Sequence, residues 1–301
     1  MRHIALIVFV LFLSVTASAQ TQDLVLPIAL NGYTTVPIHH QTIIRIVNLS
    51  PDSADVTLEA YQNDGTAVRI FGLFPIPQQG TKSVFRIESG GSVEAYTAED
   101  TPDLNGWVRL TYNVGATILA SAEVALINAP VGPHPICMRP STEINTSVQV
   151  QAVAPATKFG AFVASVTNRK SAYAIINPST TQTATVFLSL MNLSGQFVGT
   201  ATLQIPPQNR VSRFVHELVP NVPAGFMGSL HITSSLPVGF GGVNVLAPEG
   251  KLTGIQVASP PPAFCALVIA PAVNPLTNEC RLFPTPCDIP KGWLSAGSCS
   301  Q

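Results

Sequence analysis

Hydrophobic and polar residues alternate along many short stretches of this chain. In "ADVTLEAYQNDGTAV", which begins at Ala54, the apolar Val56, Leu58 and Ala60 alternate with more polar neighbours. A period of two is the pattern of a β-strand with one buried face. The Asn-Asp-Gly at residues 63–65 then predicts a tight hairpin turn, because these residue types tolerate positive φ.

The second half of the chain repeats this alternation. Val186, Leu188 and Leu190 alternate with their neighbours before "NLSG", and further predicted strands are "KSVFRIE", "GWVRLTY", "VSRFVHEL" and "GSLHITS". Helical periodicity is nearly absent, apart from a short helical turn predicted within "VSRFVHELVP". The 26 prolines and 21 glycines separate the strands. Several short strands at regular spacing predict an all-β fold, either a sandwich or a barrel.

Two distant parts of the chain share one residue pattern. "IVNLSPDSADVTLEAYQNDGT" in the first half matches "IINPSTTQTATVFLSLMNLSG" in the second, which aligns Asn48 with Asn177 at an offset of 129. The same offset aligns "IPQQGTKSVF" (76–85) with "IPPQNRVSRF" (205–214). Two further matches keep this order: "GWVRLTYN" from Gly106 with "GSLHITSS" from Gly228, and "ASAEVALINAP" from Ala120 with "GFGGVNVLAPE" from Gly239. The matches predict two diverged copies of one domain.

The first twenty residues, "MRHIALIVFVLFLSVTASAQ", read as a secretory signal peptide. A basic Arg2 precedes an apolar run from Ile4 to Val15, and Ala17-Ser18-Ala19 supplies a cleavage motif before Gln20. The alternative is a membrane anchor, but the run is shorter than the roughly 20 apolar residues that span a bilayer. We therefore expect an exported protein without a transmembrane segment, located in the periplasm, at the cell surface or in the medium.

Composition limits the partners. Only 10% of the residues are charged while 46% are hydrophobic, so Thr, Ser, Asn and Gln must make the surface polar. Typical soluble domains carry about 25% charged residues. A chain with a net charge of −1 and no basic stripe is not expected to bind nucleic acid.

Five cysteines are present, and four of them fall near the end of the chain. In an exported protein, such a cluster predicts a small disulfide-bonded module. The fifth, Cys137, is either a buried thiol or a site of intermolecular pairing. A proline-rich "SPPPAF" precedes the cluster and predicts a semi-rigid linker. The predicted disulfide residues are Cys265, Cys280, Cys287 and Cys299.

The predicted organisation has five segments. A signal peptide (1–19) precedes two β-sandwich domains (20–145 and 146–258), a linker (259–264) and a cysteine-rich module (265–301).

The two copies resemble the repeated immunoglobulin-like β-sandwich modules of exported bacterial proteins. "IVNLSPDSADVTLEAYQNDGT", "IINPSTTQTATVFLSLMNLSG" and "IPPQNRVSRFVHELVPNVPAGFMGSLHIT" carry this resemblance over most of residues 24–258. It rests on an asparagine after a strand, a glycine-containing hairpin, an Ile-Pro step and a glycine before another strand. The resemblance implies structural or surface-binding modules with no catalytic residues. The Cys…Trp…Cys core of antibody domains is absent.

The tail resembles Kazal-type protease inhibitor modules. Cys265 is followed six residues later by Pro271, an aromatic Phe283 stands four residues before Cys287, and "GSC" closes the module at Cys299. The resemblance implies protease inhibition, a Cys287–Cys299 pair and a Cys265–Cys280 pair.

The tail departs from the Kazal family at one position. Val273 stands where the family has its second cysteine, and Cys280 follows seven residues later. An inhibitory loop without that disulfide would lack the rigidity on which tight binding depends.

Candidate binding residues are few. Trp107 lies on a predicted strand and is a candidate for stacking a sugar ring, although a tryptophan packed in a core or at a sheet edge is more common. The acidic stretch "VEAYTAEDTPDLNG" is a candidate cation loop, although a solvated loop is the simpler interpretation. Its carboxylates are Glu94, Glu99, Asp100 and Asp103. No nucleophile elbow, phosphate loop or zinc-ligand spacing occurs in the sequence, so no catalytic residue, metal or cofactor is predicted.

These observations predict a non-enzymatic structural or adhesive protein. Its β-sandwich surfaces would bind an unknown protein or glycan at the cell envelope. The alternatives are a protease inhibitor acting through the tail and a carbohydrate-binding module.

Overall fold

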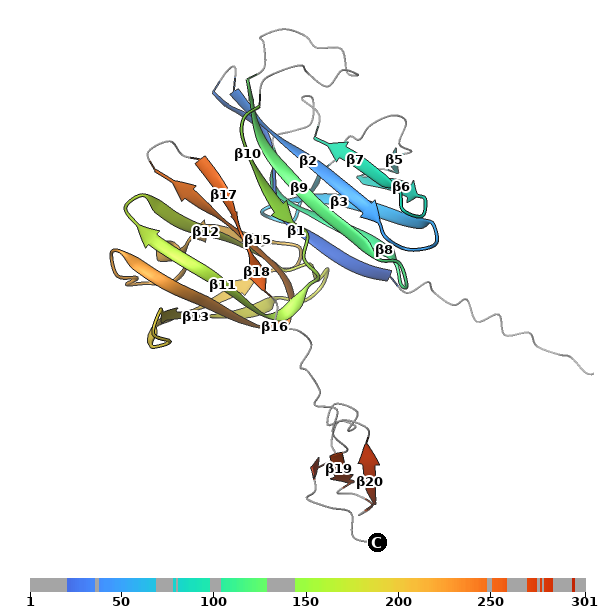
Figure 1. Ribbon diagram of the computed structural model, residues 1–301, viewed down its shortest axis with the longest axis vertical. Coiled ribbons are helices and arrows are strands. Elements are labelled where there is room, and N and C mark those ends of the chain that lie inside the picture. Colours follow the sequence, from blue (N-terminus) through green and yellow to red (C-terminus); the bar gives the residue numbers. More distant parts are fainter. Residues whose placement is uncertain are drawn as a thin grey trace, which may run out of the picture. The chain divides into compact units, whose positions relative to one another are not determined.

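The computed structural model confirms an all-β protein (Figure 1). It describes residues 21–35, 38–68, 78–79, 81–97, 104–128, 144–247, 251–258, 270–274, 277, 279–283 and 294–295. The chain forms two compact units, Met1–Ala258 and Ser259–Gln301. The one helix in the described residues, α1 (Val215–Leu218), falls within the stretch predicted to form a helical turn. No helix in the described part is both long and apolar enough to cross a membrane.

The first half of the larger unit, here called the first domain, is one folded sheet. Its strands follow the order β10-β9-β2-β1-β8-β3-β6-β5, with β4 on β3 and β7 on β2. The strands are β1 (Thr21–Thr35), β2 (Ile38–Asn48), β3 (Ala54–Gln62), β4 (Ala67–Val68), β5 (Gln78–Gln79), β6 (Lys82–Ile87), β7 (Ser92–Tyr96), β8 (Leu104–Asn113), β9 (Ile118–Asn128) and β10 (Ile144–Gln151).

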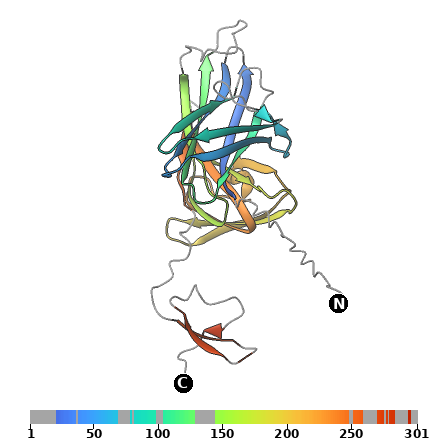
Figure 2. The same ribbon diagram turned by 90° about the vertical axis from the view of Figure 1, so that its right-hand side faces the viewer.

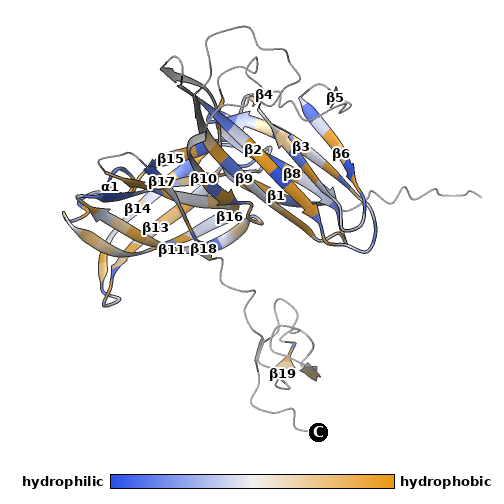
Figure 3. Cartoon of the chain, turned by 45° about the horizontal axis from the view of Figure 1, so that its top comes forward, coloured by the Kyte–Doolittle hydropathy of each residue, from blue (hydrophilic) through white to orange (hydrophobic). Residues whose placement is uncertain are grey.

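The first domain buries every second side chain between two layers of this sheet. β1 pairs with β8 along most of its length and with β2 near its end, so it joins the layers. Side chains from both layers form one core, for example Leu58 on β3, Leu110 on β8 and Ile46 on β2. Figure 3 shows apolar and polar residues alternating along these strands. The arrangement is sandwich-like, and the period of two in the sequence is what permits it.

The second half of the larger unit, here called the second domain, repeats this plan. Its sheet has the order β14-β13-β16-β11-β12-β15, with β17 on β16 and β18 on β11. The strands are β11 (Ala156–Val166), β12 (Arg169–Ile176), β13 (Ala184–Asn192), β14 (Phe197–Ile205), β15 (Arg210–Phe214), β16 (Phe226–Leu246), β17 (Lys251–Ile255) and β18 (Val257–Ala258).

The single strand β16 occupies the positions that β8 and β9 occupy in the first domain. Its first part pairs with β13 as β8 pairs with β3, and its last part pairs with β12 as β9 pairs with β2. The first domain makes a turn at Val114-Gly115 between the two strands, whereas β16 runs on for 21 residues. Figure 2 shows the larger unit from the side.

The smaller unit contains a three-stranded sheet with the order β20-β19-β21. Its strands are β19 (Ala270–Val273), β20 (Cys280–Phe283) and β21 (Leu294–Ser295).

The duplicated asparagine occupies the same corner in both domains. Asn48 Nδ2 donates to the carbonyls of Asp52, Ile87 and Glu88, and its Oδ1 accepts the N–H of Ser50. Asn177 makes the same contacts in the second domain. Its Nδ2 donates to the carbonyls of Gln182, Ile205 and Pro206, and its Oδ1 accepts the N–H of Ser179. Both asparagines are fully buried, so the sequence repeat is a structural repeat.

The repeated glycines are equally well matched. Gly106 pairs opposite Gln62, and Gly228 pairs opposite Asn192. A Cβ on either glycine would lie about 2 Å or less from a carbonyl oxygen of the facing strand, so no other residue fits. The match of "GWVRLTYN" with "GSLHITSS" is thereby confirmed.

One sequence match is wrong. Residues 82–85 belong to β6, which pairs with β3, whereas 210–214 form β15, which pairs with β12, the counterpart of β2. The partner of β2 is β7, so "IPPQNRVSRF" corresponds to residues 87–96. Gly90 and Gln208 hold the equivalent left-handed positions, at φ of 68° and 59°. The chance recurrence of Ile-Pro concealed this, because glycine in one copy is replaced by glutamine in the other.

A second match is displaced by one residue. Val47 pairs with Leu119 and Ile176 with Gly239, so Ala120 corresponds to Phe240 rather than to Gly239.

The boundary predicted between residues 145 and 146 lies inside β10. This strand stays paired with β9 as far as Gln151, and Val153 then bridges to Val25. The core of the second domain begins near Ala156. β10 is the counterpart of β17, and it belongs to the sheet of the first domain because it is hydrogen-bonded to β9.

Candidate functional site

One corner of the second domain packs against the first domain, and we call this corner the plug. This corner, residues 206–210, connects β14 to β15 and is the counterpart of residues 88–92. Gln208 takes a positive φ and Asn209 donates to the carbonyl of Asp64, 3.1 Å away. Arg210 then follows at the start of β15 with only 6% of its surface exposed.

Every hydrogen bond recorded for Arg210 at this plug goes to a neutral acceptor of the first domain. Nε lies 2.7 Å from Asn63 Oδ1, and Nη2 lies 2.5 Å from Asn105 Oδ1. Nη1 donates to the carbonyls of Pro27 and Gly106, and the backbone N–H donates to the carbonyl of Asn63. A guanidinium has five N–H donors in a fixed plane, and side-chain amides and carbonyls from three loops and strands meet them.

Burial lowers the pKa of Arg210 to about 10 from its ordinary 12.5. Within the described residues no carboxylate offsets that desolvation, because the partners of the guanidinium are amides and carbonyls. The guanidinium charge is therefore stabilised by the dipoles of these amides and carbonyls. Loss of any one acceptor should weaken the contact between the two domains.

Trp107 lies beside this plug and is fully buried. Its ring stacks on Tyr61, with 4.6 Å between centroids, and its Nε1 donates to the carbonyl of Gln208 at 3.0 Å. Val25 of the first domain and Ile176 of the second pack in the same apolar cluster. The contact between the two domains, which we call the joint, thus consists of this apolar cluster with the buried guanidinium of Arg210 beside it.

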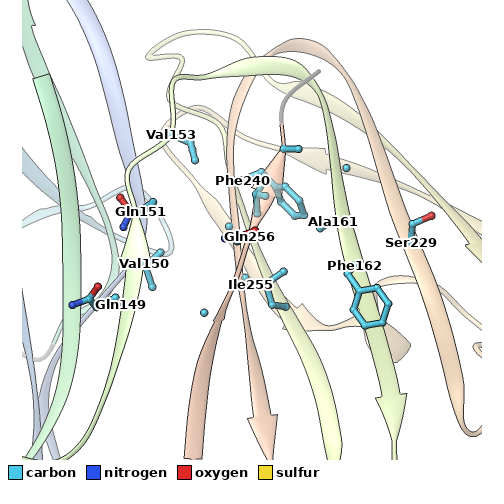
Figure 4. Close-up of a pocket in the computed structure, with 16 residues that line it drawn as sticks. Gln149, Val150, Gln151, Val153, Ala161, Phe162, Ser229, Phe240, Ile255 and Gln256 are labelled. Atoms are coloured by element: carbon cyan, nitrogen blue, oxygen red, sulfur yellow. The ribbon is translucent and has the colours of Figure 1, made fainter. Parts of the chain in front are cut away.

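A cavity of about 700 Å³ lies where β10 meets the second domain (Figure 4). Its walls come from β10, β11, β16 and the segment from β17 to β18. The lining residues used below are Gln149, Gln151, Phe162, Ser229 and Gln256. Phe162 has 43% of its surface exposed, so part of its ring faces solvent.

The cavity wall carries no ionisable side chain among its described residues. It combines glutamine amides, a serine hydroxyl, backbone groups at several glycines, and aliphatic and aromatic carbon. Amides both donate and accept hydrogen bonds, whereas charged ligands would lose hydration without gaining an ion pair. Such a wall suits an uncharged polar ligand.

One pair of side chains near the cavity resembles a nucleophile and its base. Ser229 Oγ lies 2.9 Å from His231 Nε2, on the exposed face of β16. His231 is exposed, and the described structure gives its ring no carboxylate partner. A histidine without a group to orient it, in contact with bulk water, is a weak general base.

The structure alters the reading of Trp107. This residue was a candidate for stacking a sugar, but a fully buried ring has no face for a ligand, and its place is in the joint.

The candidate cation loop is only partly described. Glu94 lies on β7 and pairs with Arg45, 3.0 Å away, while Arg45 also contacts Glu123 at 2.7 Å. Glu99, Asp100 and Asp103 lie outside the described residues. Among the described residues no group of three His, Cys, Asp or Glu side chains lies close enough to hold a metal ion.

The four tail cysteines fall mostly outside the described residues. Cys280 lies on β20 and is disulfide-bonded. Cys265, Cys287 and Cys299 are not described, as is also true of Cys137, so the pairing within the tail stays a prediction.

Sequence reasoning missed Arg210. An arginine in "PPQNRVS" looks like a surface residue, and its only unusual feature is scarcity in a chain with 15 lysines and arginines. The contacts that bury it come from residues more than 100 positions away.

No family model, curated protein or solved structure matches this chain.

Proposed function

We propose that the protein is exported and acts by binding rather than by turnover, as a structural or adhesive component of the cell envelope. The observation that carries this proposal is the plugged joint, in which Arg210 and Trp107 hold the two domains in one arrangement. A binding protein gains from such pre-organisation, because its surfaces lose less freedom when a partner docks. The low fraction of charged residues and the predicted signal peptide add support.

Export is tested in the source cells. Fractionation with an antibody to the full chain should find the protein in the periplasm, on the surface or in the medium. Mass spectrometry should place its N-terminus at Gln20. A cytoplasmic protein that retains residues 1–19 would refute the proposal of export.

Binding without turnover is tested at Ser229. A fluorophosphonate probe reacts with serine nucleophiles that a base activates, and it should leave the full chain unlabelled. Labelling that is lost in Ser229→Ala and retained in the matched Ser235→Ala would show an activated serine. The non-enzymatic proposal would then be abandoned.

A neutral glycan is the second candidate ligand, because the cavity offers amides and a partly exposed Phe162. A glycan array probed with wild type, Phe162→Ala and Leu119→Ala distinguishes this case. Leu119 is an exposed apolar residue of the first domain that does not line the cavity, so its loss should leave binding intact. Binding that Phe162→Ala does not weaken would remove the cavity from consideration.

The tail as a protease inhibitor remains an alternative proposal. The oxidised full chain should then slow a serine protease in proportion to its concentration, and the reduced chain should not.

A further inference from the structure

β14 is an unprotected sheet edge. It spans Phe197–Ile205, reads "FVGTATLQI", and pairs with β13 alone in the described structure. It contains no charged residue and no proline over nine residues. An edge of this length leaves a row of backbone N–H and C=O groups open to another strand, which is why most proteins block their edges.

The other described edge strands of five residues or more are protected. β7 carries Glu94, β15 carries the exposed Arg213, and β17 carries Lys251. The uncharged β10 is covered, since a Cβ on Gly254 of β17 would lie 2.6 Å from the carbonyl oxygen of Gln149. Charges on an edge disfavour pairing with a second chain, and a covering strand prevents it. Among these described edges, β14 alone has neither protection.

The direction of the free backbone groups follows from one hydrogen bond. Thr185 of β13 donates its N–H to Ser235 Oγ on β16, so this residue faces away from β14. Residues of an antiparallel strand alternate in the side to which N–H and C=O point. Val186 and Leu188 therefore bond to Leu203 and Ala201. It follows that Thr200, Thr202 and Gln204 direct their backbone groups outward.

The side chains of β14 form two rows. Thr200 and Thr202 lie on the exposed face, next to Phe187 of β13, which has 51% of its surface exposed. Ala201 and Leu203 lie on the core face but remain half-buried, because none of the described strands continues the layer beyond them. An added strand would complete the burial of this second row.

We propose that β14 pairs antiparallel with β14 of a second copy of this chain, about a two-fold axis through Ala201. In this register Thr200 faces Thr202 of the partner copy and Thr202 faces Thr200. Both residues direct their backbone groups outward, so the two pairs form about four N–H···O bonds. The threonines meet threonines on the outer face and the half-buried row meets itself on the core face. Cross-strand pairs of this kind stabilise a sheet, and no like charges oppose each other.

The self-complementary rows favour a second copy over a different protein, and an isologous contact of this type closes as a dimer. The inference does not depend on the proposed function.

Sedimentation of the chain from Gln20 onward, over a range of concentrations, tests the dimer. Thr202→Pro removes an outward N–H that β13 does not use, so the domain should fold while the dimer dissociation constant rises at least tenfold. Thr202→Val keeps the N–H and a branched side chain, so it should dimerise like wild type. Circular dichroism and thermal melting check that each variant is folded. A monomer at all concentrations, or a dimer that folded Thr202→Pro leaves unchanged, would overturn the proposal.

A second variant tests the register. Ala201 faces its own copy as a pair without mutual hydrogen bonds, where side chains approach most closely. Ala201→Cys should therefore form a covalent dimer on mild oxidation, whereas the matched Leu203→Cys should not. Cross-linking of both variants alike, or of Leu203→Cys alone, would overturn the register through Ala201.

Discussion

Arg210 Nε lies 2.7 Å from Asn63 Oδ1, across a separation of 147 residues in the chain. This contact joins a corner of the second domain to the turn between β3 and β4 of the first domain, and it is part of a set that includes Asn105 and two carbonyls. The corner has a counterpart in the first domain, where Ser92 stands in place of Arg210. Of these two corners, only that of the second domain therefore carries the arginine.

Replacing Arg210 should weaken the joint strongly. Arg210→Met keeps much of the side-chain volume but leaves buried amides and carbonyls without donors, at a cost of about 3 kcal/mol. Urea unfolding should show this loss and should separate into two transitions, because each domain would then unfold alone. Arg213→Met is the matched control, since Arg213 lies exposed on the same strand and should change the free energy of unfolding by less than about 0.5 kcal/mol. Equal effects of the two substitutions would show that the plug contributes little.

Trp107 should behave as a core residue. Trp107→Phe loses one hydrogen bond to Gln208 and should cost about 1 kcal/mol, while Trp107→Ala should cost about 3–5 kcal/mol. Chemical denaturation of both variants measures the losses, with the exposed Leu119→Ala as control. A loss of less than about 1 kcal/mol for Trp107→Ala would contradict the burial described here.

The two corner asparagines should be equivalent in energy. Asn48→Ala and Asn177→Ala each leave three carbonyls and one N–H without the side chain that meets them, so each should cost about 2–3 kcal/mol. Urea midpoints at constant slope measure the change, and the exposed Asn113→Ala should have almost no effect. If only one of the two substitutions destabilises the protein, the two corners share their geometry but do not contribute equally to the free energy of unfolding.

Stability should fall at high pH through the buried tyrosines. Burial raises the pKa of Tyr173, Tyr61 and Tyr112 above the ordinary value of 10. The unfolded chain then releases these phenolic protons first as pH rises above about 10, so the stabilisation that is complete below this pH is progressively lost. Arg210 acts in the opposite sense, because its pKa is lowered by burial and the unfolded chain holds that proton longer.

Comparison with Tyr173→Phe isolates the tyrosine contribution, since Arg210 is common to both proteins. The free energy of unfolding, measured in urea between pH 9 and 11.5, should decline less steeply in Tyr173→Phe than in wild type. Absorbance near 295 nm, compared between wild type and Tyr173→Phe, should show that Tyr173 stays protonated above pH 10 while the protein is folded. Parallel pH profiles would mean that the phenol of Tyr173 ionises normally in the folded protein.

Much of the local structure could be predicted from the sequence. The alternation around Leu58 and Leu188 predicts strands with one buried face, and both residues are fully buried. The short turn of helix at Val215–Leu218 was also predictable, because it depends on neighbours within a few residues. Strand propensity and turn chemistry act over that range. The repeat of Asn48 in Asn177 was visible because the residues around each asparagine recur in the sequence.

Errors arose where distant residues decide the outcome. The pairing of residues 205–214 with 76–85 followed a shared Ile-Pro, but hydrogen bonds to Asn177 and β12 assign them to the place of residues 87–96. Likewise β10 belongs to the first domain because β9 pairs with it. Sequence similarity does not record which strand lies alongside.

The sequence by itself determined that this chain forms strands, that the strands bury alternate side chains, and that the plan occurs twice, since these properties follow from the order of neighbouring residues. Only the tertiary structure decided that Trp107 is buried instead of exposed to a ligand, that Arg210 crosses into the other domain, and that β14 is left as an open edge. Burial and pairing depend on which surfaces meet after folding, and residues a hundred positions apart supply those surfaces.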